Sequence, residues 1–241
     1  SQADYFQSVK GGGHGDYKMI TLAPSSVQEM ADFTVLSFDL AFKYRNPVMI
    51  LADGIVGQMM EKVVLPPFTP GKTEEEIRRE CPWATLGKTK DRGPNYITSL
   101  ALKSEEMEEI NLRLQSRYRE MEKTEVRYEE IMCDDADYIF VAFGITARIC
   151  QKTVELARAE GIKAGLLRPI TLYPFPTDII KSHLNKVKGF MSIELNAGQM
   201  VEDVRLAVEG KVPVEFYGRM GGIVPSPSEV LDALKAKLIN K

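Results

Sequence analysis

Apolar residues in the first fifty positions follow two spacings. A short apolar run at 17–23 is followed by residues 27–42, where apolar side chains recur at helical intervals. One of the serines at 25–26 is expected to cap this helix, with Glu29 placed for a capping box. The run 47–52 is continuously apolar with β-branched members, which is typical of a strand covered on both faces. Strand, helix and strand predict a parallel crossover unit.

The middle of the chain loses this pattern. Prolines, glycines and charges interrupt residues 65–103, which we expect to be an irregular connection. Residues 104–130 are rich in Glu, Lys and Arg with sparse apolar positions, so they predict a mostly solvated helix that bridges two domains.

The last hundred residues alternate between strand-like and helix-like segments, which predicts an α/β domain with a doubly wound parallel sheet. We expect domains at 1–66 and 135–241, joined by a linker at 67–134. The expected strands are 138–143, 163–167, 189–195 and 212–217, and the expected helices are 146–159, 177–184, 199–208 and 228–238.

Composition narrows the class of protein. A net charge of −3 gives no general attraction to nucleic acid. No apolar stretch approaches the length of a membrane helix and no signal peptide opens the chain, so we expect a cytoplasmic protein without a membrane partner. Cys81, Cys133 and Cys150 are scattered and too few for an Fe–S cluster that requires four thiolates. We therefore expect any electron carrier to lie on another chain.

Two glycine-containing turns carry candidate chemistry. The run 11–16 lacks the spacing of a nucleotide-binding loop, so a tightly turned loop is the default interpretation. Its His14 is either functional or a structural hydrogen-bonding histidine, whereas His183, on an expected helix, is interpreted as structural. The turn 144–148 has only one of the glycines of a dinucleotide fingerprint.

Polar residues also follow the later strands. Glu194 and Asn196 stand where a strand ends, at the sheet edge that usually carries α/β sites. The favoured interpretation is a helix cap and a subunit contact. Arg219, between glycines, could meet an anionic ligand, and we favour a salt bridge to a partner chain.

Several segments, taken in order, resemble the α subunit of 2-oxoacid:ferredoxin oxidoreductases. The early segments resemble the later half of its pyrimidine-binding domain, residues 167–176 are similar to its transketolase C-terminal-like domain, and the middle resembles the linker of 2-oxoisovalerate enzymes. The segments that carry the resemblance are 1–7, 13–16, 23–30, 51–54, 82–85, 92–95, 111–115, 125–129 and 167–176.

The resemblance implies oxidative decarboxylation of a branched 2-oxoacid to an acyl-CoA, with electrons passed to ferredoxin. In the full complex it implies thiamine diphosphate and Mg²⁺ held by a β subunit with the diphosphate-binding domain, together with a γ subunit and a ferredoxin-like δ subunit carrying Fe–S clusters. Coenzyme A and the 2-oxoacid are the expected substrates.

This sequence departs from the family at one point. The Tyr-Pro-x-Thr-Pro segment, the activating glutamate and the substrate-facing arginine of the family are not among these residues, so we assign no catalytic residue and no metal ligand. Because the chain starts at Ser1 and soon reaches a strand, we expect it to begin inside the pyrimidine-binding domain and to be inactive alone. His14, Asp16 and Asp53 are near-site candidates.

Three alternatives remain. The first is a pyruvate- or 2-oxoglutarate-specific member of the same family. The second is a transketolase or dehydrogenase E1-type chain. The third is a non-catalytic α/β interaction module, for which the absence of a nucleophile and of a metal cluster is ordinary.

Overall fold

A computed structural model describes residues 1–13, 15–65, 71–85, 87–88, 90–91 and 93–240. The chain divides into two compact units, which are residues 1–64 together with 114–241, and residues 65–113. The predicted domain boundaries at 66/67 and 134/135 stay a prediction. Among the described residues, no helix has the length and apolarity needed to cross a membrane.

The larger unit contains a five-stranded sheet in the order β3-β5-β4-β7-β8. Its members are β3 (Tyr128–Ile131), β4 (Tyr138–Val141), β5 (Ala164–Pro169), β7 (Gly189–Glu194) and β8 (Val214–Gly218). The last four run parallel, which confirms the doubly wound sheet. The edge strand β3 is antiparallel to β5, and the prediction of a helix through residue 130 was wrong.

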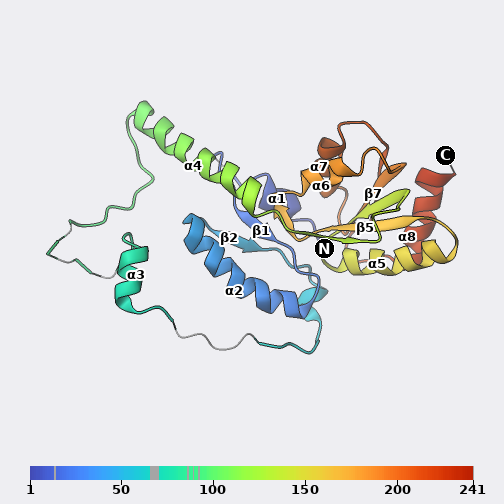
Figure 1. The fold of residues 1–241 in the computed structure, drawn as a ribbon, viewed down its shortest axis with the longest axis horizontal. Helices are drawn as coiled ribbons and strands as arrows, with labels where there is room; N and C mark the ends of the chain where they lie inside the picture. Colours follow the sequence, from blue (N-terminus) through green and yellow to red (C-terminus); the bar gives the residue numbers. More distant parts are fainter. Residues whose placement is uncertain (14, 66–70, 86, 89, 92, 241) are drawn as a thin grey trace. The chain divides into compact units, whose positions relative to one another are not determined.

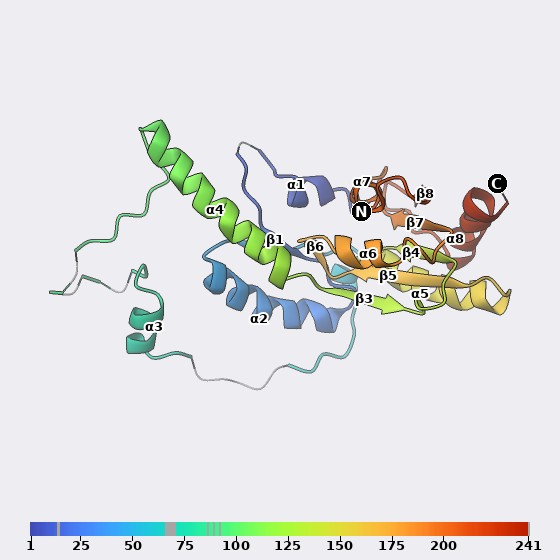
Figure 2. The same cartoon turned by 45° about the horizontal axis from the view of Figure 1, so that its top comes forward.

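Helices cover both faces of this sheet (Figures 1 and 2). On one face α5 (Gly144–Ala159) and α8 (Pro227–Leu234), which continues as a π-helical turn at Lys235–Ile239, pack on Phe140 and Met191. The other face is covered by three further helices, whose core includes Ile139 and Phe190. These helices are α1 (Tyr5–Val9), α6 (Thr177–Ser182) and α7 (Met200–Val208).

A second, three-stranded sheet has the order β2-β1-β6. Strands β1 (Ile20–Leu22) and β2 (Val48–Ile50) are parallel and are joined by helix α2 (Val27–Tyr44), which confirms the predicted crossover unit. Ser26 caps α2 and accepts the Glu29 N–H at 3.2 Å. Strand β6 (Thr171–Tyr173), which sequence patterning did not predict, pairs antiparallel with β1.

Helix α4 (Ser104–Thr124) confirms the predicted charged helix but ends earlier than predicted. Its last turns bury Tyr118 and Met121 against Phe33 and Leu40 of α2. After β2, the chain makes a single 3₁₀ turn, Val56–Gln58.

The smaller unit contains α3 (Glu74–Glu80), in a region predicted to be irregular. Thr73 and Glu76 form a reciprocal capping box, and Arg78 pairs with Glu74 one turn before it. These local contacts explain a short helix with no buried residue.

Candidate functional site

The carboxyl ends of β4 and β7 mark the point where the strand order of the large sheet reverses. From β4 the chain proceeds to β5 on one side and later returns to β7 on the other. Open α/β sheets bind ligands in the crevice at such a reversal, beside the N-termini of the following helices. Helices α5 and α7 follow β4 and β7 here.

Glu194 fills the N-terminus of α7. Its side chain is fully buried, and one carboxylate oxygen accepts the N–H groups of Gln199 at 3.0 Å and Met200 at 2.8 Å. The other oxygen accepts the Val201 N–H at 2.9 Å and the Ser192 hydroxyl at 2.9 Å. Four donors therefore satisfy this carboxylate, which acts as a helix cap.

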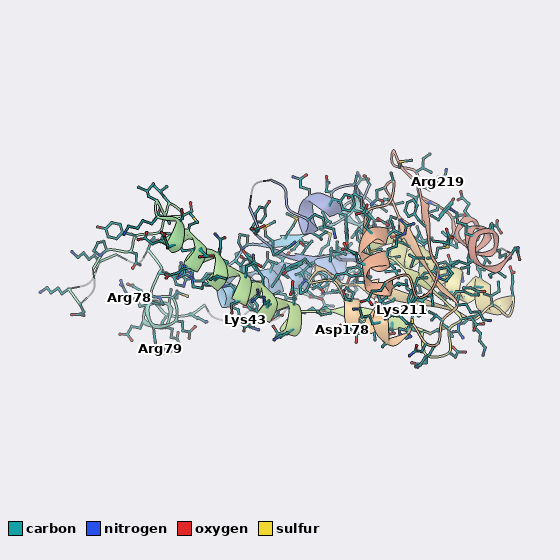
Figure 3. All side chains as sticks on the ribbon, turned by 90° about the horizontal axis from the view of Figure 1, so that it is seen from above. Lys43, Arg78, Arg79, Asp178, Lys211 and Arg219 are labelled. Atoms are coloured by element: carbon teal, nitrogen blue, oxygen red, sulfur yellow. The ribbon has the colours of Figure 1, made fainter. Side chains whose placement is uncertain are left out.

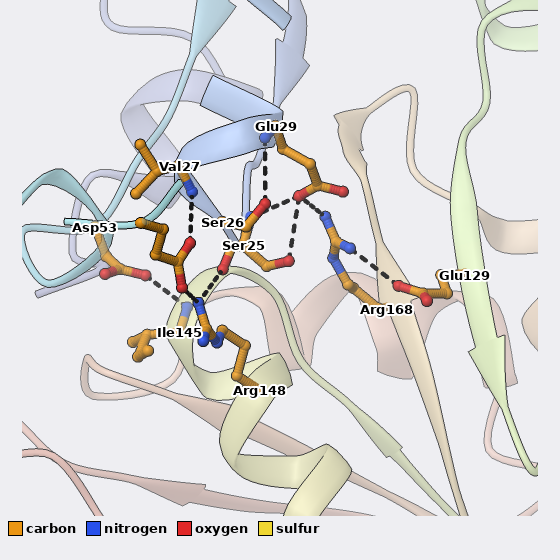
Figure 4. Close-up of polar contacts among 10 residues, drawn as sticks. Ser25, Ser26, Val27, Glu29, Asp53, Glu129, Ile145, Arg148 and Arg168 are labelled. Carbon is orange, nitrogen blue, oxygen red and sulfur yellow. Dashed lines mark hydrogen bonds and ion pairs between the residues drawn. The ribbon is translucent and has the colours of Figure 1, made fainter. Parts of the chain in front are cut away.

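Asp53 fills the N-terminus of α5 in the same way, although it lies 92 residues away in sequence (Figure 4). Its Oδ2 accepts the Ile145 N–H at 2.7 Å, and its Oδ1 accepts the N–H groups of Ile55 at 3.1 Å and Val56 at 3.0 Å. Gly144 has a φ of +59°, and a Cβ there would lie 2.4 Å from Asp53 Oδ2. The close approach of the carboxylate therefore requires glycine at this position.

Gln2 occupies the space between the two strand ends, a role that sequence reasoning did not detect. Its amide donates to Phe143 O at 2.9 Å and accepts the Leu195 N–H at 3.1 Å. Its backbone N–H donates to Leu195 O at 3.0 Å, and its carbonyl accepts the Asn196 amide at 3.0 Å. Gln2 is 4% exposed, so residues of this chain fill the crevice.

This arrangement does not fit a bound diphosphate or dinucleotide. The backbone donors that would meet a phosphate at α5 and α7 are already taken by the carboxylates of Asp53 and Glu194. In the described part of the chain, no group of three or more His, Cys, Asp or Glu side chains could hold a metal ion. The edge acts as a structural junction.

A second polar cluster lies next to this junction (Figure 4). Arg148, on α5, donates to Glu61 Oε1 at 2.7 Å, and Glu61 Oε2 accepts the Val27 N–H at 3.0 Å at the start of α2. The Val27 N–H, and after it the Arg148 guanidinium, hold the pKa of Glu61 below its ordinary value. The cluster links α2 to α5.

Arg168, on β5, completes this cluster. It is 5% exposed and pairs with Glu29 of α2 and, at 2.9 Å, with Glu129 of β3. Glu29 also accepts the Ser25 N–H at 2.7 Å. No sequence pattern marked these pairs, because each joins residues that are far apart along the chain.

Two further candidates, Arg219 and Asp16, lie outside the helices and strands. Arg219 donates its backbone N–H to Glu194 O at 3.2 Å, and its side chain pairs with Glu229 at 2.8 Å near the surface (Figure 3). Asp16 lies exposed on the glycine-rich loop, and its carbonyl accepts the Gln115 amide at 3.1 Å. His14 lies outside the described residues. The subunit-contact roles of Glu194, Asn196 and Arg219 stay a prediction.

Two cysteines and the one described histidine lie in the interior of the fold. Burial raises the pKa of Cys133 to about 12, and burial also raises the pKa of Cys150. His183 is 5% exposed and its Nε2 lies 2.5 Å from Glu130 Oε1, so it joins α6 to β3. Its place in the fold is structural.

Two family descriptions match the chain. Residues 1–132 match "Pyruvate flavodoxin/ferredoxin oxidoreductase, thiamine diP-bdg", and residues 136–230 match "Pyruvate:ferredoxin oxidoreductase core domain II". Three contacts in Figure 4, those of Asp53 with Ile145, Glu61 with Arg148 and Glu29 with Arg168, therefore join parts of the chain that belong to different family domains.

Relatives agree with these matches. The ketoisovalerate oxidoreductase subunit VorB of Methanothermobacter thermautotrophicus is 47% identical over 97% of this chain, which spans 64% of that relative's length. The 2-oxoglutarate synthase subunit KorA of Methanothermobacter marburgensis is 33% identical over 97% of the chain and 68% of its own length.

A solved structure of a 2-oxoglutarate:ferredoxin oxidoreductase from Magnetococcus marinus superposes with a TM-score of 0.78 at 20% identity. The match covers 99% of this chain and 45% of that one, and it supports the fold. From the family matches and the sequence identities together, the chain belongs to the 2-oxoacid:ferredoxin oxidoreductase family and corresponds to part of an α subunit of the ketoisovalerate sequence type.

Proposed function

We propose that this chain is part of an enzyme complex that oxidatively decarboxylates branched 2-oxoacids, above all 2-oxoisovalerate, to acyl-CoA and passes the electrons to ferredoxin. The observation that carries the proposal is the 47% identity to VorB, against 33% to KorA over the same share of the chain.

Partner subunits complete the proposed complex. A β subunit holds the diphosphate of thiamine diphosphate and its Mg²⁺, a ferredoxin-like δ subunit carries Fe–S clusters, and a γ subunit joins them. Thiamine diphosphate, when bound, stabilises the carbanion that decarboxylation produces. The helix N-termini of α5 and α7 have their donors occupied by Asp53 and Glu194, which supports a diphosphate site on the partner subunit.

The contribution of this chain is to keep its two family domains in a fixed relation. Asp53 ties the segment after β2 to the start of α5, and Glu61 and Arg148 tie α2 to α5. These contacts hold one family domain rigidly against the other. Such rigidity matters for catalysis, because misplacement of a reacting group by about 1 Å can lower the rate about a hundredfold.

Substrate comparison with the assembled complex tests the proposal. An isopropyl group requires an apolar pocket, whereas 2-oxoglutarate requires a cation for its second carboxylate. We expect kcat/KM for 2-oxoisovalerate to exceed that for 2-oxoglutarate and pyruvate, with ferredoxin or a viologen as acceptor. A preference for 2-oxoglutarate of about tenfold, or about 1.4 kcal/mol, would overturn the branched-chain assignment. Inactivity on all three substrates would favour a non-catalytic module.

A second measurement uses the 241-residue chain alone. We expect no oxidoreductase activity and no binding of thiamine diphosphate with Mg²⁺ in calorimetry, because this sample lacks the β subunit that is proposed to hold the diphosphate and the metal. Micromolar binding by the isolated chain would contradict the proposed division of the cofactor site between subunits.

A further inference from the structure

A cavity of about 840 Å³ opens in the larger unit, away from the sheet edge described above. It is bordered by α1, the last turn of α4 and the segment from β6 into α6. Apolar and aromatic side chains form much of its wall, including Tyr173, Phe175 and Ile179. Its volume falls within the range of about 300–1,000 Å³ that is typical of small-molecule sites.

Two carboxylates of this cavity have partners within the chain. Asp203 pairs with Lys10 and accepts the Tyr5 hydroxyl at 2.7 Å. Glu122 accepts the Tyr173 hydroxyl at 3.1 Å. Burial, and after it the nearby Glu122, raises the pKa of Tyr173, so this phenol stays a donor.

The third carboxylate, Asp178, is exposed in the first turn of α6 (Figure 3). A helix N-terminus carries a partial positive charge that offsets a carboxylate there.

Two lysines that line the cavity have no carboxylate partner among the described residues. Lys18 is half-buried, and its ammonium lies 5.6 Å from the Tyr173 ring centroid and 3.4 Å from Val9 O. It has no carboxylate partner among the described residues, and neither does the exposed Lys123. An anion placed beside Lys18 would therefore gain a charge-assisted hydrogen bond that the described residues do not supply.

The glycine-rich loop places one of these lysines. Lys10 and Lys18 stand at its two ends, and both border the cavity. Gly11 and Gly15 have φ values of +99° and +108°, which few other residues adopt. The chain therefore borders the same cavity before and after the loop. This gives the glycine run a structural role that does not depend on nucleotide binding.

We propose that this cavity binds an organic anion, with its carboxylate or phosphate held by Lys18 and Lys123 and its apolar or aromatic body against Tyr173 and Phe175. The proposal is independent of the reaction proposed above. It adds a ligand site at a place distinct from the junction of Asp53 and Glu194.

Binding to the assembled complex tests it with three probes of matched size. 3-Phenylpropionate and phenyl phosphate carry the anion, and 3-phenylpropanamide replaces it with a neutral group. We expect saturable binding of an anionic probe in calorimetry and saturation-transfer NMR, with affinity for the neutral amide lower by about tenfold or more.

Variants locate the binding. Lys18→Met should weaken anion binding about tenfold, whereas Lys18→Arg, which keeps the charge, should change it less than about threefold. Lys152→Met is the matched control, because Lys152 is an exposed lysine on α5 that pairs with Glu155 and does not border the cavity. It should leave binding unchanged. If Lys18→Met fails to fold, Lys123→Met and Lys18→Arg carry the same comparison.

The outcomes separate cleanly. Tighter binding of phenyl phosphate identifies phosphate esters as the class of ligand, and tighter binding of phenylpropionate identifies carboxylic acids; both support the site. Equal binding of the amide, an unchanged affinity in both Lys18→Met and Lys123→Met, or no saturable binding of either anion would overturn it. Substrate kinetics are measured separately, so a failure here leaves the proposed reaction standing.

Discussion

The carboxyl edge of the five-stranded sheet and the cavity beside β6 treat their charged groups in opposite ways. At the edge, Asp53 and Glu194 are buried and accept three and four hydrogen bonds at 3.1 Å or less. At the cavity, Lys18 and Lys123 have no carboxylate partner in the described part of the chain. Topology indicates the first place as a usual ligand site, whereas lysines without a carboxylate partner indicate the second. A fully satisfied carboxylate has no remaining capacity for a ligand.

The largest effect should follow from disturbing the edge. Gly144→Ala places a methyl group where Asp53 Oδ2 is 2.4 Å away, at a positive φ. We expect the free energy of unfolding to fall by about 3 kcal/mol, measured by urea denaturation.

Gly161→Ala is the control for the edge. Gly161 also has a positive φ, of +82°, but no atom lies within 4 Å of its added Cβ. Gly161→Ala should lower the free energy of unfolding only by the backbone strain, about 1 kcal/mol. Equal losses in the two variants would show that Asp53 does not constrain the start of α5.

An intermediate loss of stability is expected at a third buried carboxylate, Glu125, which lies outside the sheet edge but also has several hydrogen-bond donors. Glu125, at the end of α4, is 3% exposed and accepts Lys43 at 2.7 Å, the Tyr44 hydroxyl at 2.6 Å and Arg127 at 2.9 Å. Burial opposes its ionisation, yet these donors outweigh burial and lower the pKa of Glu125. We expect Glu125→Gln to destabilise the chain by about 2 kcal/mol at pH 7.

The sign of the pH dependence follows from that lowered pKa. A carboxylate with a lowered folded pKa stabilises the protein above its ordinary value of 4.5 and loses this contribution as pH falls through the folded pKa. The stability difference between the natural chain and Glu125→Gln should therefore shrink below about pH 4.5. A difference that grows on acidification would refute the assignment of Glu125 as an ionised acceptor.

The smallest effect should come from the outer face of α2. Phe38 is 65% exposed, so Phe38→Ser should change the free energy of unfolding by less than about 0.5 kcal/mol. The same change at Phe33, which is 9% exposed and packs in the core, should cost about 3 kcal/mol. A large loss at Phe38 in thermal denaturation would show that this face is covered.

Sequence patterning predicted the elements whose signals are local. The apolar spacing and Ser26 defined α2, and the alternation of apolar runs defined the parallel strands. The capping box of Thr73 and Glu76 is also a local signal, but it stands in a segment that prolines interrupt. Strand β3 was missed because Glu129 and Glu130 are exposed and resemble the charged helix before them; only pairing with β5 makes them a strand.

The candidate site was predictable in position but not in role. Asp53 and Glu194 follow strands, so their place at strand ends was visible in the sequence. Their acceptance of helix N–H groups depends, for Asp53, on a partner 92 residues away. Nothing in the local pattern indicated the structural role of Gln2, because its contacts are with strand ends 141 to 194 residues later.

The contacts of Gln2 also set an order of events during synthesis. Its amide meets Leu195 at a separation of 193 residues, and the Tyr5 hydroxyl meets Asp203 at 198. Closing such a loop costs about 2.5 kcal/mol more in chain entropy than closing one of about 12 residues, so these contacts form late. Residues 1–9 leave the ribosome long before β7 and α7 exist. Their apolar side chains, Tyr5 and Val9 among them, therefore stay exposed until the sheet has formed. During that time they are the kind of surface that chaperones bind.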